Sequence, residues 1–388
     1  MKKIAFAIEN FSRFGGGAES YAVCLAETLI KKGWEVHFFG ERWDGEPKGA
    51  IFHLIYIPSY LPQWLKLLLF ALRHKKMVGL HHFDVVLGFG NTICMNVYQS
   101  HGGVHWLTTE RKVFSEQNAL LRSIKRILIR LSLKQHVRNW IESAAFRIHP
   151  LPVIVAISDM VKDDFVSYFG VQPENVTLVY NGVDGTKFMS EVGPSQEVLL
   201  RCEKVGAIDS DDCLVFLFVS YELKKKGILP LLNAVNMLKK KKRSGFKLLV
   251  VGGTVEVWLK RLVTKLGIEE NVIFYGASKN IQEIFAISDV LILPTYYDAC
   301  SLVVFEAMMS GVVPVTTNSN GAAGIINDGV NGYVLSHPPS AEEICDKLDN
   351  LFDMEQLGRL SSMAVNTGKR YTLEKNHEKM LEIFSSVV

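Results

Sequence analysis

The sequence has few cysteines and no closely spaced pair of them. Six cysteines are spread over 388 residues, without a C-x-x-C motif or an accompanying cluster of histidines. Disulfide-stapled secreted domains and structural zinc sites both depend on such spacing. The pattern therefore argues against both and indicates a protein of the reducing cytoplasm.

Long apolar runs are also missing. The longest apolar stretch, Trp64–Leu72, is interrupted by Lys66 and is shorter than the roughly 20 residues that cross a bilayer. At the N-terminus, Glu9 and Asn10 end the apolar segment that follows Met1-Lys2-Lys3. We therefore expect a first strand there rather than a signal peptide, and no transmembrane segment.

An excess of one sign of charge is absent as well. The formal net charge is only +3, and no stacking-aromatic or groove-reading motif indicates a nucleic-acid partner. Apolar residues, by contrast, are plentiful: 48% are hydrophobic and 21% are charged, which is typical of a folded protein. The length of 388 residues suits two domains of ordinary size.

Short apolar runs alternate with helical patterns along the chain, which is typical of parallel sheets with helices on both faces. A helix is expected over Ala18–Lys32, ended by Gly33. A polar segment, Val192–Asp212, separates the halves, and we place the linker near 183–190. In the first half we expect strands at Ile4–Ile8, Glu35–Phe39, Val85–Gly88, Val97–Gln99, Ile154–Ile157 and Thr177–Val179. In the second half we expect them at Leu214–Val219, Lys247–Val251, Val272–Tyr275, Val290–Leu293 and Val312–Thr316. The pattern predicts an α/β protein of two doubly wound domains, residues 1–187 and 188–369, with a cleft between them.

Three glycines, Gly15, Gly16 and Gly17, follow the first predicted strand and open a helix. Backbone N–H groups at such a place can approach an anion, and the helix dipole favours a phosphate. The tripeptide is not a G-x-G-x-x-G fingerprint. A tight turn without a ligand therefore remains an equal alternative.

Two carboxylates follow the predicted strand Val290–Leu293. Asp298 lies in the loop after the strand, and Glu306 lies about one turn into a helix that begins near Ser301 or Leu302. Open α/β sheets bind ligands at the carboxyl ends of their strands. Carboxylates accept hydrogen bonds from sugar hydroxyls, while free helix N–H groups suit a phosphate. The alternative is that Glu306 pairs within its own helix, although that helix is otherwise apolar and a lone carboxylate there is costly.

This block resembles the C-terminal signature of family 4 retaining glycosyltransferases. From Pro294 to Val315 it reads P-x3-D-x7-E-A-x2-x-G-x2-P-V. The chain also contains, in the family's order, Phe14-Gly15-Gly16-Gly17, Ser100-His101-Gly102, Ala156-Ile157-Ser158, Tyr180-Asn181-Gly182-Val183-Asp184 with Phe188, Lys225-Lys226-Gly227 and Gly329-Val330-Asn331-Gly332. The resemblance covers essentially the whole chain and implies the GT-B fold, two Rossmann-like domains facing a central cleft.

Within that family, the first half is most similar to the lipopolysaccharide-core glucosyltransferases. The residues that carry this narrower resemblance are Gly40-Glu41-Arg42-Trp43-Asp44-Gly45 and His101-Gly102-Gly103-Val104-His105. The resemblance also implies that the final segment, residues 370–388, returns to the N-terminal domain.

The resemblance implies a role for each matching residue of the second domain. Glu306 would bind the ribose hydroxyls of the nucleotide, beside Ser301, Leu302 and Val303 at the start of the same helix. Asp298 would contact hydroxyls of the donor sugar. The family usually has glutamate at that position, so the shorter side chain puts the identity of the sugar in doubt.

Three further residues match the family's charged and polar positions. Lys226, with Lys225 in place of the usual arginine, would neutralise the diphosphate on which charge accumulates. A solvated basic turn is the competing interpretation of these lysines. His101 would lie near the sugar, although a lone histidine is often structural. The expected catalytic residues are thus His101, Asp298 and Lys226.

The activity implied is transfer of a hexose from a nucleotide-sugar, expected to be a UDP-sugar, to a glycolipid such as a lipopolysaccharide core intermediate. The nucleotide-sugar is a co-substrate, and no cofactor is expected. No side-chain nucleophile is evident, which suits a retaining front-face reaction. No metal is expected, because the single D-x-D match, Asp209-Ser210-Asp211, lies in the polar segment. Two alternatives remain open: a GT-B nucleotide-sugar epimerase, and a non-catalytic nucleotide-sugar-binding protein on the membrane surface. Asp298 and Lys225 favour the second alternative, whereas Glu306, Lys226 and the glycine loop argue against it.

Basic residues gather between Arg111 and Arg147, where nine Lys and Arg stand against two acids. Apolar side chains recur there at helical spacing, and Arg122, Arg126 and Arg130 fall on another face. Such a helix can lie on an anionic membrane, and a solvated basic face is an equal alternative. Segment 60–76 adds apolar residues followed by basic ones. We therefore expect a cytoplasmic protein associated with the inner face of the plasma membrane through segments 60–76 and 111–147.

Overall fold

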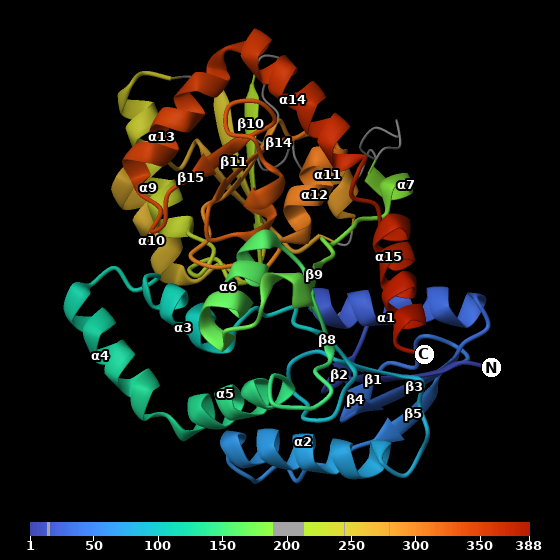
Figure 1. Cartoon of the computed structure of the whole chain (residues 1–388). Helices are drawn as coiled ribbons and strands as arrows, with labels where there is room; N and C mark the ends of the chain where they lie inside the picture. Colours follow the sequence, from blue (N-terminus) through green and yellow to red (C-terminus); the bar gives the residue numbers. More distant parts are fainter. Residues whose placement is uncertain (14–15, 189–212, 244, 279) are drawn as a thin grey trace. The chain divides into compact units, whose positions relative to one another are not determined.

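The computed structural model describes residues 1–13, 16–188, 213–243, 245–278 and 280–388. The chain divides into two units, residues 1–180 with 374–388 and residues 181–373 (Figure 1). The sequence-based divisions were at 187/188 and 369/370. The segment that begins at Asn181 is tied to the second unit because Val183 N donates to the Tyr371 carbonyl at 3.1 Å, and Leu373 N donates to the Val183 carbonyl at 2.9 Å.

The first unit contains a parallel sheet of seven strands in the order β5-β3-β1-β6-β7-β8-β9. A short ladder pairs β2 with β4. The strands are β1 (Lys3–Ala7), β2 (Asn10–Phe11), β3 (Glu35–Gly40), β4 (Arg42–Trp43), β5 (Ile51–Leu54), β6 (Val85–Gly88), β7 (Val97–Gln99), β8 (Val153–Ala156) and β9 (Val176–Leu178). The strand order reverses direction between β1 and β6, as in doubly wound folds. All six expected strands of this half are therefore confirmed to within a residue.

Seven helices belong to the described part of this unit, and one of them comes from the end of the chain. They are α1 (Gly17–Lys31), α2 (Gln63–Val78), α3 (His105–Val113), α4 (Ala119–Leu131), α5 (Leu133–Ala145), α6 (Asp159–Phe169) and α15 (Leu373–Ser386), with the 3-10 turn η1 (Pro173–Asn175). Figure 1 shows α15 beside α1. Met380 and Phe384 of α15 are fully buried in one cluster with Phe6 and Phe38 of the sheet. The last helix is therefore part of the core of the first unit.

The second unit contains a parallel sheet of six strands in the order β12-β11-β10-β13-β14-β15. The strands are β10 (Leu214–Ser220), β11 (Phe246–Gly252), β12 (Val272–Gly276), β13 (Val290–Leu293), β14 (Val313–Thr317) and β15 (Tyr333–Leu335). The helices and 3-10 turns are α7 (Gly185–Phe188), α9 (Ile228–Lys240), α10 (Val257–Leu266), α11 (Ile281–Ala286), α12 (Leu302–Met309), η2 (Gly321–Ile325), α13 (Ala341–Asp349), η3 (Asn350–Phe352) and α14 (Met354–Gly368). The order reverses between β10 and β13, so this unit is doubly wound too.

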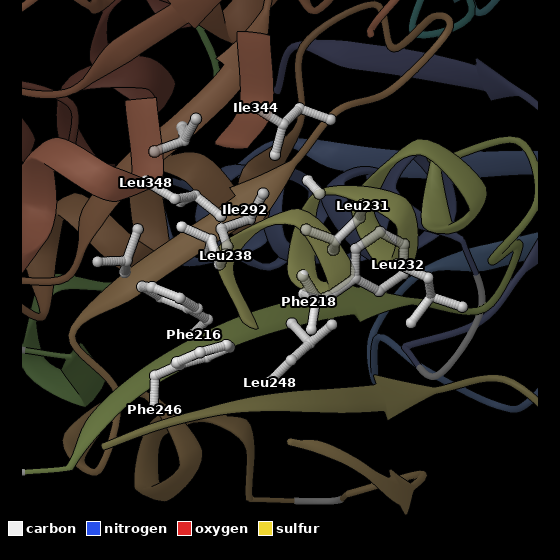
Figure 2. Packing of buried hydrophobic residues seen from close by; sticks show 14 of the residues in the cluster. Phe216, Phe218, Leu231, Leu232, Leu238, Phe246, Leu248, Ile292, Ile344 and Leu348 are labelled. Carbon is white, nitrogen blue, oxygen red and sulfur yellow. The ribbon is translucent and has the colours of Figure 1, made fainter. Parts of the chain in front are cut away.

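The core of the second unit lies between the sheet and the helices α9 and α13. Figure 2 shows Phe216, Phe218 and Leu248 of the strands pointing toward Leu231 of α9 and Ile344 of α13. Alternate residues of a strand share one face, so Phe216 and Phe218 reach the same layer. This packing fixes β10 and α9, and with them the turn between them that carries Lys225 and Lys226.

Four of the described strands were not predicted from the sequence: the two-residue strands β2 and β4, and the strands β5 and β15. β5 is an edge strand whose Ile51 and Leu54 are exposed, so it lacks the continuous apolar run of a strand buried on both faces. β15 has only three residues. In the described part of the chain, no helix combines the length and apolar character needed to cross a bilayer.

Candidate functional site

A tight turn after β10 places two lysines against the loop that follows β13. Gly227 has φ +86°, and a Cβ atom there would lie 2.0 Å from the Pro294 carbonyl oxygen, so only glycine fits. Tyr296 N also donates to the Lys225 carbonyl at 3.2 Å. Because β10 and β13 flank the point where the strand order reverses, the two loops meet where open α/β sheets bind ligands.

At this point Lys226 Nζ forms an ion pair with Asp298 Oδ2. The residues are 72 positions apart in the sequence, and their side chains are 20% and 22% exposed. The structure thus brings together two residues that the family resemblance assigned to the donor site. A partly buried lysine–carboxylate pair at a ligand-binding edge can exchange its carboxylate for a ligand phosphate.

Lys225 points to a different partner. It forms an ion pair with Glu222, and both side chains are about half exposed. Lys225 therefore matches the competing interpretation of a solvated basic turn, while Lys226 does not. The adjacent lysines differ because one faces Asp298 and the other faces solvent.

The loop that carries Asp298 is held by the end of β14 and the residues that follow it. Thr316 Oγ1 donates to the Leu293 carbonyl at 2.7 Å, and Thr317 Oγ1 donates to the Thr295 carbonyl at 2.6 Å. Asn320 Oδ1 accepts from Ser301 N at 3.2 Å. Sequence analysis missed these threonines and Asn320. Their only signal is the polar run that begins in the last two residues of β14, Thr316-Thr317-Asn318-Ser319-Asn320.

Helix α12 begins directly after this loop. Ser301 is its N-cap residue without a side-chain capping bond, and the N–H groups of Leu302 and Val303 have no partner within the helix. Glu306 is on the next turn. Burial raises the pKa of the Glu306 carboxyl to about 7. The helix N-terminus and a carboxyl group that is easily protonated thus lie one turn apart.

The carboxylate of Glu306 makes no hydrogen bond or ion pair with the residues that the structure describes. The structure therefore does not show the alternative pairing of Glu306 within its own helix. A partly buried carboxyl group without a protein partner is costly, and such groups with displaced pKa values gather at functional sites.

His101 follows β7 in the first unit. Its ring lies 4.6 Å from the ring of Tyr21 and 5.5 Å from that of Phe89, between centroids. Burial lowers the pKa of the His101 imidazole to about 4, so the ring is neutral at pH 7. Its Nε2 is buried and has no hydrogen-bond partner in the described structure. His101 is therefore a neutral donor or acceptor held by packing.

The glycine turn before α1 is only partly described, because Gly15 lies outside the described residues. Gly16 and Gly17 are exposed. The Gly16 N–H donates to Glu19 Oε2 at 3.3 Å. An anion at this helix N-terminus would therefore compete with the carboxylate of Glu19, which favours the interpretation as a turn over a phosphate site.

Metal ligands do not gather in the part of the chain that the structure describes. No group of three or more histidine, cysteine, aspartate or glutamate side chains there could hold a metal ion. The Asp209-Ser210-Asp211 match and most of the polar segment Val192–Asp212 lie outside the described residues.

The basic amphipathic region forms α3, α4 and α5, and α4 exposes its apolar side. None of its residues is buried, and Figure 1 draws it away from the strands of its unit. Arg122 and Arg126 lie over the ring of Phe114 at 5.2 and 5.1 Å. The large apolar side chains that are exposed on and beside α4 are Leu120, Leu121, Ile124, Ile127, Leu128, Leu131 and Leu133.

Segment 60–76 differs from α4 in how much of its apolar surface is buried. It forms most of α2, which packs against α5. Phe70, Ala71 and His74 are buried, and Trp64 is partly buried. Part of its apolar surface therefore serves the fold, while Tyr60 and Leu72 remain exposed. Its exposed basic residues are Lys75 and Lys76.

Both halves of the chain match models of glycosyltransferase domains. Residues 15–187 match the model described as glycosyltransferase family 4, and residues 206–370 match the model described as glycosyl transferases group 1. The two matches divide the chain in the same region as the structure does.

The chain is also similar to characterised proteins over nearly its whole length. It is 26% identical over 347 residues to the lipopolysaccharide glucosyltransferase WaaG of Escherichia coli K12, covering 89% of this chain and 88% of that one. A crystal structure of WaaG superposes with a TM-score of 0.80 at 23% identity, covering 98% of this chain and 99% of that one. Anabaena HepE, in complex with UDP and glucose, superposes with a TM-score of 0.70 at 18% identity over the full length of both chains.

Proposed function

The chain belongs to the two-domain glycosyltransferases of the GT-B type, and from this premise we propose that it transfers a hexose from a UDP-sugar to a glycolipid. The observation that supports this most directly is the Lys226–Asp298 pair beside the N-terminus of α12 and Glu306. The similarity to a lipopolysaccharide glucosyltransferase supports a core intermediate as the acceptor. The UDP and glucose bound in a structural relative support the donor.

In this proposal the donor diphosphate takes the place of Asp298 as the partner of Lys226. The free N–H groups of Leu302 and Val303 add the positive end of a helix dipole. Together they stabilise the negative charge that develops on the leaving phosphate, which is a large contribution in group-transfer enzymes. Asp298 is then released to accept hydrogen bonds from hydroxyls of the sugar.

Glu306 accepts hydrogen bonds from the ribose hydroxyls. Burial raises the pKa of its carboxyl group to about 7 because the charged form loses water. Hydrogen bonds from two ribose hydroxyls replace that water and stabilise the carboxylate. His101, neutral at pH 7, contributes a hydrogen bond to a hydroxyl of the donor sugar. These assignments follow the residues of the family motif that this chain retains.

The reaction breaks the bond between the anomeric carbon and the diphosphate oxygen and forms a bond from that carbon to the acceptor oxygen on the same face. The acceptor proton passes to the leaving phosphate, so no side-chain nucleophile and no divalent cation are required. Configuration at the anomeric carbon is retained.

The acceptor is reached at a membrane surface. We assign α4 as the helix that lies on the anionic inner leaflet, with its apolar side chains in the interface and Arg122, Arg126 and Arg130 near the lipid phosphates. The protein is then peripheral to the inner face of the plasma membrane.

The test compares two neighbouring lysines. The purified protein, with and without EDTA, is incubated with UDP-, ADP- and GDP-sugars, and nucleotide release is measured. Lys226→Ala is expected to lower release by about a hundredfold or more, as loss of one transition-state donor does. Lys225→Ala, which removes only an exposed ion pair with Glu222, is the control and should stay within about threefold, in keeping with the small value of exposed pairs.

Two results would contradict the proposal. Equal effects of the two lysine substitutions would remove the diphosphate role of Lys226. Loss of release in EDTA, restored by a divalent cation, would overturn the metal-free reaction. An assay of the anomeric configuration of the product tests retention separately.

A further inference from the structure

Helix α15, from the end of the chain, makes buried polar contacts with α1. Tyr21 and Asn376 are 6% and 3% exposed, and the Tyr21 hydroxyl donates to Asn376 Oδ1 at 3.0 Å. Gln99 Nε2, at the end of β7, donates to the same hydroxyl at 3.4 Å. One hydroxyl thus connects the first helix, the last helix and the strand that precedes His101.

The orientation of the Asn376 amide is fixed from its other side. Asn376 Nδ2 donates to the Tyr180 main-chain carbonyl at 2.7 Å. A flipped amide would place its oxygen against that carbonyl oxygen, so Asn376 must present Oδ1 to Tyr21. The tyrosine hydroxyl is therefore held by a group that the backbone itself orients.

The ring of Tyr21 in turn packs against His101. The two centroids are 4.6 Å apart, and Phe89 lies on His101 as well, at 5.5 Å. His101 Nε2 has no hydrogen-bond partner in the described structure. The orientation of the imidazole therefore depends on the aromatic rings around it, and among these Tyr21 is the one anchored by hydrogen bonds at its far end.

We propose that Tyr21 and Asn376 are positioning residues for the transfer reaction: Asn376 fixes the Tyr21 hydroxyl, and the Tyr21 ring fixes the imidazole of His101 for its hydrogen bond to the donor sugar. The inference rests on the role given to His101 in the proposed function. It makes the last helix of the chain a determinant of turnover as well as of the core.

A second hydrogen bond of the same helix pair supplies the control. Thr28 Oγ1 and His377 Nδ1 are 2.8 Å apart, seven residues along α1 from Tyr21. This bond also joins α1 to α15, but Thr28 does not contact His101. Thr28→Val and Tyr21→Phe each remove one hydroxyl from the same interface while keeping the shape of the side chain.

The experiment measures the melting temperature, kcat and the donor KM of Tyr21→Phe, Asn376→Leu and Thr28→Val. Small displacements of a reacting group are costly, so we expect the first two to lower kcat about tenfold with KM changed less than about twofold. Thr28→Val should lower the melting temperature about as much as Tyr21→Phe does, because both lose one hydroxyl from the same helix interface, but it should leave kcat unchanged. A fall of kcat in all three variants alike would overturn the inference, because it would reflect the helix interface in general.

The decisive measurement repeats Tyr21→Phe in a His101→Ala background. If Tyr21 acts through His101, its substitution has no further effect on kcat there. An equal loss in both backgrounds, or none in the parent, overturns the positioning role while the proposed function stands. Unchanged kcat in His101→Ala alone would instead overturn the role given to His101 in the proposed function.

Discussion

At the scale of single residues, the site consists of groups that are costly until a ligand arrives. Glu306 is a partly buried carboxyl group without a partner among the described residues, and His101 Nε2 is a buried nitrogen without one. Lys226 and Asp298, by contrast, satisfy each other. Folding alone would favour apolar residues at positions 306 and 101. The presence of Glu306 and His101 is therefore best explained by ligand binding.

The pH dependence of stability follows from Glu306. Burial raises its pKa to about 7 from the ordinary value of 4.5, so between these values the folded state binds more protons than the unfolded state, and stability falls as pH rises. Glu306→Gln should therefore have a higher free energy of unfolding in urea than the parent at pH 8, by about 3 kcal/mol, with little difference at pH 5. A gap of the same size at both pH values would show that the carboxyl group is not strained. The same variant should lose donor binding, the usual cost of relieving a strained site.

At the scale of elements, α4 has a face that its own unit does not cover. Its apolar side chains lie on the outside although its sequence pattern is strongly amphipathic. A helix normally buries such a face, and large exposed apolar patches mark interaction surfaces. α2 is the contrasting case, because Phe70 and Ala71 are buried where it packs against α5.

This contrast predicts that α4 can be changed without loss of stability. Ile124→Ser combined with Leu128→Ser should leave the melting temperature within a few degrees, since neither side chain is buried, and should lower binding to anionic vesicles at least tenfold. Phe70→Ala in α2 is the matched comparison: it should destabilise the protein by about 3 to 5 kcal/mol. Vesicle sedimentation and thermal melting separate the two effects. Unchanged vesicle binding after both serine substitutions would rule out α4 as the membrane helix.

At the scale of the whole molecule, the fold was predictable where a local pattern sufficed. Runs such as Val290–Leu293, buried on both faces, identify central strands of a parallel sheet. The edge strand β5 and the three-residue β15 carry no such run and were missed. That Lys226 and Asp298 lie close together could be expected, because both follow a strand at the carboxyl edge of the sheet.

The rest of the site depends on contacts that no local pattern encodes. Asn320 holds the start of α12 from another loop, and Asn376 reaches Tyr21 across 355 positions of sequence. A polar residue in a turn and one in an amphipathic helix are both common, so neither stands out in the sequence. Their roles follow only from the tertiary hydrogen bonds that bury them.

The last prediction concerns Gly182, in the segment where the chain enters the second unit. Gly182 lies where Val183 pairs with Thr372, and a Cβ atom at Gly182 would be 2.2 Å from the Thr372 carbonyl oxygen. Gly182→Ala should therefore push apart the two segments and destabilise the protein by about 1 to 3 kcal/mol. Gly358→Ala is the matched control, since Gly358 lies in α14 with nothing near its Cβ position, and it should stabilise by about 0.5 to 1 kcal/mol. Urea unfolding of both variants measures the difference. If Gly182→Ala were as stable as the parent, the pairing of these segments would be dispensable to the fold.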